Sequence, residues 1–71
     1  MKTIQGVLSN LKVVDSLSNV QEMTVLSFEI RCTQVELTSH KEVKIKNGDK
    51  IIVAGMENAA HIFKAYSYKR L

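Results

Sequence analysis

The stretch Thr24-Val25-Leu26-Ser27-Phe28-Glu29-Ile30-Arg31-Cys32 decides the fold of this chain, because apolar and polar residues alternate along it. Alternation with a period of two is the pattern of a β-strand that buries one face. The predicted core face carries Leu26, Phe28, Ile30 and Cys32. The opposite face carries Ser27, Glu29 and Arg31. The stretch therefore predicts a strand at the centre of a β-protein.

A second alternating run follows with the opposite parity. Its apolar positions are Val35, Leu37, Val43 and Ile45, and the polar stretch from Ser39 to Glu42 interrupts it as a loop or an exposed segment. A shift of one residue exchanges the two faces of a strand. A turn or bulge near Thr33 must therefore reset the register.

Asn47-Gly48-Asp49 is the strongest turn signal in the chain, because Asn and Gly tolerate the positive φ of a tight hairpin. We expect antiparallel strands on both sides of this turn. The following strand runs from Ile51 to Met56, and a final strand from Ile62 to Leu71 follows a loop at Glu57 to Ala60. The predicted core is completed by Val53 and Phe63.

Two segments also fit a helix. The segment from Ile4 to Asp15 contains apolar residues at helical spacing, but its glycine and its valines favour a strand. We expect a strand bent at Gly6, since an isolated glycine in a strand marks a bulge or a tight bend. The tail after Gly55 contains no helix breaker, so an α+β fold with a C-terminal helix is the alternative.

Length and composition indicate one small globular domain over residues 1–71. The chain has 45% hydrophobic and 24% charged residues, as globular domains do, and it contains neither proline nor a repeat that would mark a linker. Its longest plain apolar run, Ile51 to Ala54, is far below the ~20 residues that a membrane helix needs. The polar start lacks a secretory signal, and the single Cys32 agrees with a reducing compartment. We expect a cytoplasmic protein without membrane insertion.

The stretch from Gly48 to Gly55, followed by Phe63-Lys64-Ala65-Tyr66, resembles the last hairpin of OB-fold domains. The resemblance implies an all-β, five-stranded OB-like barrel, and closure best removes the exposed edges of so few strands. OB folds often insert a helix between the third and fourth strands, and Ser39 to Glu42 is too short to form it. One barrel end is then uncovered, or covered by a partner.

A basic and aromatic ladder is predicted in the tail. Alternation places Phe63, Ala65, Ser67 and Leu71 on one face of the last strand and places on the other face Lys64, Tyr66, Tyr68 and Arg70. Phosphates pair with cations and bases stack on flat rings, so this face suits single-stranded nucleic acid. Lys44 and Lys46 before the turn, with Lys50 after it, extend the surface, and the net charge of +3 mildly favours an anionic partner. Alternatively, the tyrosines cap the barrel and the lysines keep a sheet edge soluble.

The OB-fold resemblance implies a different binding face, on the second and third strands. That face carries Ser27, Glu29, Arg31, Gln34 and Glu36. Arg31 adds a cation there, whereas the two carboxylates would repel phosphate.

No enzyme chemistry, metal site or cofactor is expected. Cys32, His40 and His61 lack the close spacing of structural zinc ligands, and the three glycines lie too far apart for a phosphate loop. The sequence thus predicts weak, largely sequence-independent binding of single-stranded DNA or RNA. The alternative is a protein-protein interaction or accessory module that docks or self-associates through an open barrel end or edge strand. In one form of this alternative, the module is a domain excised from a larger protein.

Overall fold

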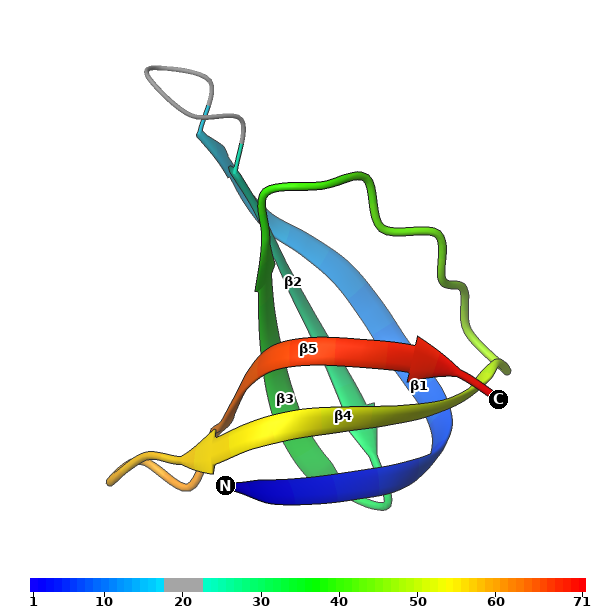
Figure 1. Ribbon diagram of the computed structural model, residues 1–71, viewed down its shortest axis with the longest axis vertical. Helices are drawn as coiled ribbons and strands as arrows, with labels where there is room; N and C mark the ends of the chain where they lie inside the picture. Colours follow the sequence, from blue (N-terminus) through cyan, green and yellow to red (C-terminus); the bar gives the residue numbers. More distant parts are fainter. Residues whose placement is uncertain (18–22) are drawn as a thin grey trace.

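Five β-strands close into a barrel in the order β1-β2-β3-β5-β4 (Figure 1). The computed structural model describes residues 1–17 and 23–71, with side chains for 1–14 and 24–71. The strands are β1 (Lys2–Leu17), β2 (Met23–Ile30), β3 (Thr33–Ser39), β4 (Lys50–Glu57) and β5 (Phe63–Arg70). Neighbours are antiparallel except β3 and β5, which run parallel. The predicted all-β barrel is confirmed and consistent with an OB-like fold, whereas both helical alternatives are wrong.

Strand β1 belongs to two walls of the barrel. Its residues 2–7 pair with β4, and from Leu8 onward it pairs with β2. The register is irregular between Ser9 and Lys12, where Asn10 has a φ of 53°, and again between Val13 and Asp15. Strand β1 also curves where its partner changes from β4 to β2, next to the predicted bend at Gly6 (Figure 1). Gly6 is closely packed there, because a Cβ at this position would lie 2.9 Å from Cγ2 of Ile30.

The core fills the barrel with side chains from all five strands. Its buried members are Leu8, Leu26, Phe28, Ile30, Val35, Leu37, Ile51, Val53, Phe63 and Ala65. The predicted core residues Leu26, Phe28, Ile30, Val53 and Phe63 are among them, whereas Cys32 is not. Strand β2 ends at Ile30, and Arg31 and Cys32 form a two-residue turn with φ values of 51° and 65°. Two positive φ values define a type I′ hairpin. This turn resets the register as predicted, but it leaves Cys32 exposed.

The Asn47-Gly48 turn leads into β4 as predicted, but it does not connect two strands. Residues 42–46 form no strand, so the expected hairpin is wrong on that side. The Asp49 N–H donates to the Lys46 carbonyl at 3.1 Å, and only Gly48 in this turn has a positive φ, of 96°. A type I′ hairpin turn requires a positive φ at both central residues. The turn therefore lacks the twist that would pair the flanking segments.

The turn binds β1 instead. The Gly48 N–H donates to the Leu8 carbonyl at 2.8 Å, and the Leu11 N–H donates to Oδ1 of Asn47 at 2.9 Å. Residues 40–49 thus form an extended β3–β4 connection whose far end is fixed to the β1 bulge (Figure 1). Val43 and Ile45 of this connection pack half-buried on the core. They close part of the barrel end that the missing helix was expected to leave uncovered.

Candidate functional site

A β-bulge in β5 divides the ladder predicted for the tail. Ala54 lies opposite Ser67 and Gly55 lies opposite Ala65, so Tyr66 is the extra residue on β5. An extra residue reverses the parity of every side chain that follows it. The four predicted ladder residues therefore do not share one face, and the sequence prediction is wrong on this point.

The two tyrosines end on different sides of β5. Tyr66 is 64% exposed on the outside of the barrel, whereas Tyr68 is half-buried against the core. The bulge also makes Ser67 exposed although it was predicted on the core face, and Leu71 at the chain end is exposed too. A run of bases cannot stack on both rings in succession along one surface.

Lys64 is already paired. Its Nζ lies 2.7 Å from Oε1 of Glu36, and the two residues are direct neighbours in the parallel register of β3 and β5. This ion pair joins the strands that close the barrel. Lys64 therefore contributes less net positive charge to a ligand than its place in the sequence suggested.

The outer face of β2 and β3, which the OB-fold resemblance implied as a binding surface, is occupied by internal hydrogen bonds. Nε2 of Gln34 donates to Oγ of Ser27, and Nδ2 of Asn10 donates to Oε2 of Glu29. Arg31 stands apart from this face in the exposed β2–β3 turn. The face combines two carboxylates with amides and hydroxyls, and it has no aromatic ring among the described residues. This arrangement does not favour phosphate.

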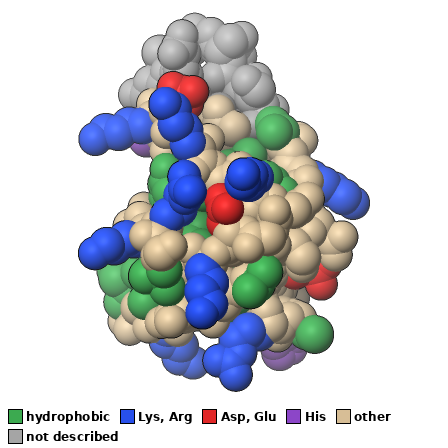
Figure 2. All heavy atoms as spheres, turned by 90° about the vertical axis from the view of Figure 1, so that its right-hand side faces the viewer, with side chains coloured by type: hydrophobic (Ala, Val, Ile, Leu, Met, Phe, Trp, Pro, Cys, Tyr) green, Lys and Arg blue, Asp and Glu red, His purple; other side chains and the backbone are tan. Residues whose placement is uncertain are grey.

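Three of the predicted site residues meet at the other end of β5. A groove of about 290 Å³ lies between the β3–β4 connection and the end of β5, and its lining residues are Lys44, Ile45, Lys46, Asp49 and Arg70. We call it the cationic groove. The barrel side that carries the connection shows many Lys and Arg side chains with few acidic ones between them (Figure 2). The groove brings together cations from segments that are distant in the sequence.

The lysines of the β3–β4 connection are exposed because they alternate with residues that pack on the core. Val43 and Ile45 turn toward the core, so alternation leaves the side chains of Lys44 and Lys46 exposed. Among the described residues, neither lysine forms an ion pair. Both charges are consequently available to an anionic ligand.

Asp49 lines the groove and contacts both the turn and Arg70. Its Oδ2 accepts a hydrogen bond of 3.0 Å from the Lys46 N–H and lies 3.7 Å from Nε of Arg70. The Asp49 side chain is only 13% exposed, while that of Arg70 is 58% exposed. The carboxylate thus holds the turn and orients Arg70, and the guanidinium still faces solvent.

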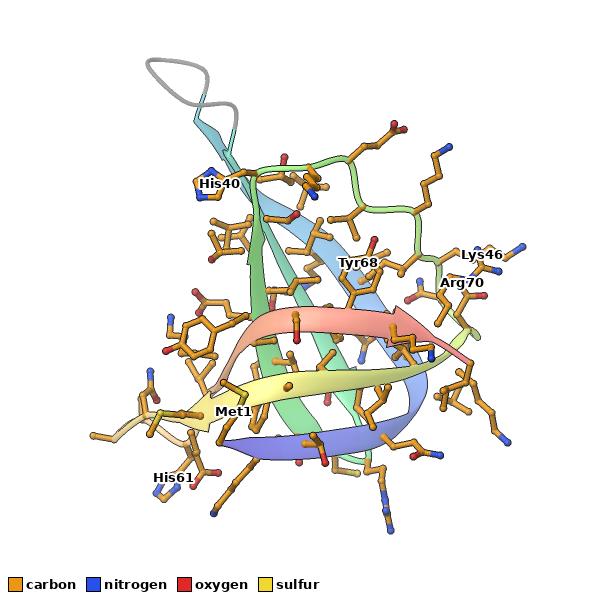
Figure 3. All side chains as sticks on the ribbon, in the orientation of Figure 1. Met1, His40, Lys46, His61, Tyr68 and Arg70 are labelled. Carbon is orange, nitrogen blue, oxygen red and sulfur yellow. The ribbon has the colours of Figure 1, made fainter. Side chains whose placement is uncertain are left out.

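Tyr68 precedes Arg70 by two residues on the same side of β5, but it is not among the residues that line the cationic groove. Figure 3 shows it on the side of β5 that faces the β3–β4 connection, with Lys46 and Arg70 toward the chain end of the same space. His40 and His61 lie elsewhere in that view, and Nδ1 of His61 is 4.0 Å from a carboxylate oxygen of Glu57. The groove lining thus combines three cations, one carboxylate and the side chain of Ile45, and the ring of Tyr68 lies on the same side of β5 as Arg70.

Sequence reasoning missed Asp49 and Ile45 as parts of this site. The signal for Asp49 was its place two residues after Asn47, where a carboxylate can bond the main chain of the turn. A second hollow of about 230 Å³, lined by Met1, Lys2, Met56 and Glu57, contains none of the predicted residues.

The comparisons with known protein families, curated proteins and solved structures gave no match to this chain. Over the described residues, no helix has the length and apolar character needed to cross a membrane. In that same part of the chain, no three His, Cys, Asp or Glu side chains gather where they could hold one metal ion. The cationic groove is the candidate functional site in the described part of the chain.

Proposed function

We propose that this domain binds single-stranded nucleic acid weakly and with little sequence preference, through the cationic groove. The observation that carries the proposal is the convergence of Lys44, Lys46 and Arg70 around one groove that holds a single carboxylate. Cations that follow a phosphate backbone supply the sequence-independent part of nucleic-acid affinity. Three cations support a weak site.

The aromatic part of the site supports the same conclusion. One ring, that of Tyr68, shares a side of β5 with Arg70, while Tyr66 lies on the outer face. Stacking of a base on an aromatic side chain contributes about 1–3 kcal/mol, and every base offers a flat face. A single stacking position predicts low affinity and slight base preference.

An OB-like barrel would here use its end instead of the outer face of β2 and β3. On that outer face Glu36 is bound to Lys64, and Glu29 accepts a hydrogen bond from Asn10. A phosphate there would meet two carboxylates at close range. The barrel end with the cationic groove offers the opposite electrostatics.

The test is binding of a fluorescent oligothymidylate of about 12 nucleotides, followed by anisotropy between about 0.05 and 0.2 M salt. Each phosphate contact with a single strand adds about 0.7 to the slope of log K against log salt concentration. The triple variant Lys44→Ala/Lys46→Ala/Arg70→Ala should lose a slope of about 2 and most of its affinity.

Lys2→Ala is the matched single-charge control for Lys44→Ala, because Lys2 lines the second hollow instead of the groove. It should leave the salt slope unchanged, whereas Lys44→Ala should lower it. Absence of wild-type binding at low salt, or equal effects of the two variants, would overturn the proposed function.

A further inference from the structure

The edge of β5 beyond Ala65 has no main-chain partner among the described residues. Strand β3 pairs with β5 only at residues 35–37, opposite residues 63–65. On its other side β5 stays paired with β4 as far as Arg70. Residues 66–70 therefore present an open strand edge on the side away from β4.

The register identifies which groups lie at this edge. The Leu71 N–H donates to the Lys50 carbonyl at 2.9 Å, which makes these two residues a hydrogen-bonded pair. Hydrogen-bonded and non-hydrogen-bonded pairs alternate along an antiparallel ladder. Lys69 and Ser67 therefore bond to β4, and the N–H and C=O groups of Tyr68 and Arg70 point away from it. An open edge of this kind is a template for another strand.

The surroundings of the edge define what it can accept. The cationic groove adjoins the end of the edge, since Arg70 of β5 lines it together with Lys44 and Lys46 of the β3–β4 connection. Ile45 in the lining and the half-buried Tyr68 provide apolar contacts. A strand laid along β5 would thus place alternate side chains against apolar groups and meet positive charge at the rim.

We propose that the open edge of β5 binds an extended acidic peptide, which adds a strand beside Tyr68 and Arg70. Main-chain hydrogen bonds give such complexes their affinity, and side-chain contacts and charge select the sequence. A second copy of this chain is disfavoured, because its own groove lysines and Arg70 would approach charges of the same sign. Nucleic acid lacks amide groups at strand spacing and cannot complete the edge. This proposal does not depend on the nucleic-acid function.

Amide hydrogen exchange tests the proposal directly, with Ser67 and Lys69 as internal controls. In the free protein the amides of Tyr68 and Arg70 should exchange fast, whereas those of Ser67 and Lys69, bonded to β4, should exchange slowly. The probe is a blocked peptide of about eight residues that alternates Asp and Val, long enough to form a strand. At saturation it should slow exchange at Tyr68 and Arg70 by about tenfold or more, since each forms a new hydrogen bond.

Two variants at position 70 distinguish the contribution of the main-chain hydrogen bond to peptide affinity from that of the charge. Arg70→Ala and Arg70→Pro both remove the guanidinium, but only proline removes the N–H that faces the edge. Proline is tolerated in edge strands where its nitrogen faces solvent. The affinity of Arg70→Pro for the peptide should be about tenfold lower than that of Arg70→Ala. If the proline variant does not fold, amide exchange of the wild type at Tyr68 and Arg70 still tests whether the peptide binds at this edge.

Several results would overturn the inference. These are absence of peptide binding, equal binding of a Lys-Val peptide of the same length, and binding that leaves the Tyr68 and Arg70 amides fast. Protection of these two amides in the free protein at high concentration, with a dimer in sedimentation, would assign the edge to a second copy. Equal protection of both amides by the oligothymidylate would assign it to nucleic acid.

Discussion

The replacement Gly55→Ala tests the closest approach of two strands in the barrel. A Cβ at position 55 would lie 1.9 Å from the Lys64 carbonyl oxygen and 2.8 Å from Cα of Ala65. Both atoms belong to the main chain, so no side-chain rotation relieves the clash, and β4 must move away from β5 at the bulge. Overpacking typically costs about 1–3 kcal/mol. We expect about 3 kcal/mol or more here, because the barrel wall itself must shift.

That loss is large against the whole stability of the domain. At roughly 0.05–0.15 kcal/mol per residue, a chain of this length has a free energy of unfolding of about 4–11 kcal/mol. Urea unfolding followed by circular dichroism measures the change, and a slope near 1 kcal/mol/M converts 3 kcal/mol into a midpoint lower by about 3 M.

Gly6→Ala is the matched control, because its Cβ would meet side-chain atoms instead of main-chain atoms and at longer distances, Cγ2 of Ile30 at 2.9 Å and Cγ of Arg31 at 3.0 Å. We expect it to cost less than about 1.5 kcal/mol. Equal midpoints for the two alanine variants, or a cost of Gly55→Ala below about 1 kcal/mol, would refute the close packing at the β5 bulge.

Three further predictions follow from the fold and the groove. Phe28 is fully buried, so Phe28→Ala should lower the free energy of unfolding by about 3–5 kcal/mol in the same urea assay; a loss under about 1 kcal/mol would contradict the core assignment. Gly48→Ala should cost about 1–2 kcal/mol in calorimetry, since φ is 96° and no atom obstructs the new Cβ; a neutral substitution would be inconsistent with that backbone. In oligothymidylate anisotropy, Tyr68→Leu should weaken binding by about 1–3 kcal/mol and Tyr66→Leu should not. Equal losses would show that both tyrosines belong to one binding surface.

The sequence predicted those parts of the fold in which polar and apolar residues alternate without interruption. Leu26, Phe28 and Ile30 are buried because a half-buried strand repeats every two residues. The barrel followed from the number of strands and from the need to remove their edges. These predictions depend on patterns that packing in the barrel reinforces.

The bulge at Tyr66 could not be predicted, because it depends on the contact between β5 and Gly55 across the sheet. The same holds for the Arg31-Cys32 turn, in which two residues without a turn preference adopt positive φ values to join paired strands. The bulge moved Tyr68 away from the predicted ladder face, and the turn moved Arg31 away from the outer face of β2.

The candidate site was predicted in part. Lys44, Lys46 and Arg70 do meet in the cationic groove, but through a connection that forms no strand. Asn47 and Gly48 signal a turn locally, whereas their bonds to Leu8 and Leu11 on β1 depend on the tertiary structure. Local propensity indicated the turn, and tertiary contacts decided what the turn joins.

The double role of β1 has a consequence for the rate at which the domain folds. Lys2 pairs with Gly55, so one wall of the barrel forms only when the start of β1 meets β4, which is distant in the sequence. Closing so large a loop is entropically costly, and β-proteins with such distant pairings fold in milliseconds to seconds. Before that step, β1, β2 and β3 can pair as an open meander with unprotected outer edges. Refolding yield should therefore fall as protein concentration rises, although the finished barrel pairs each described strand with two neighbours over part of its length.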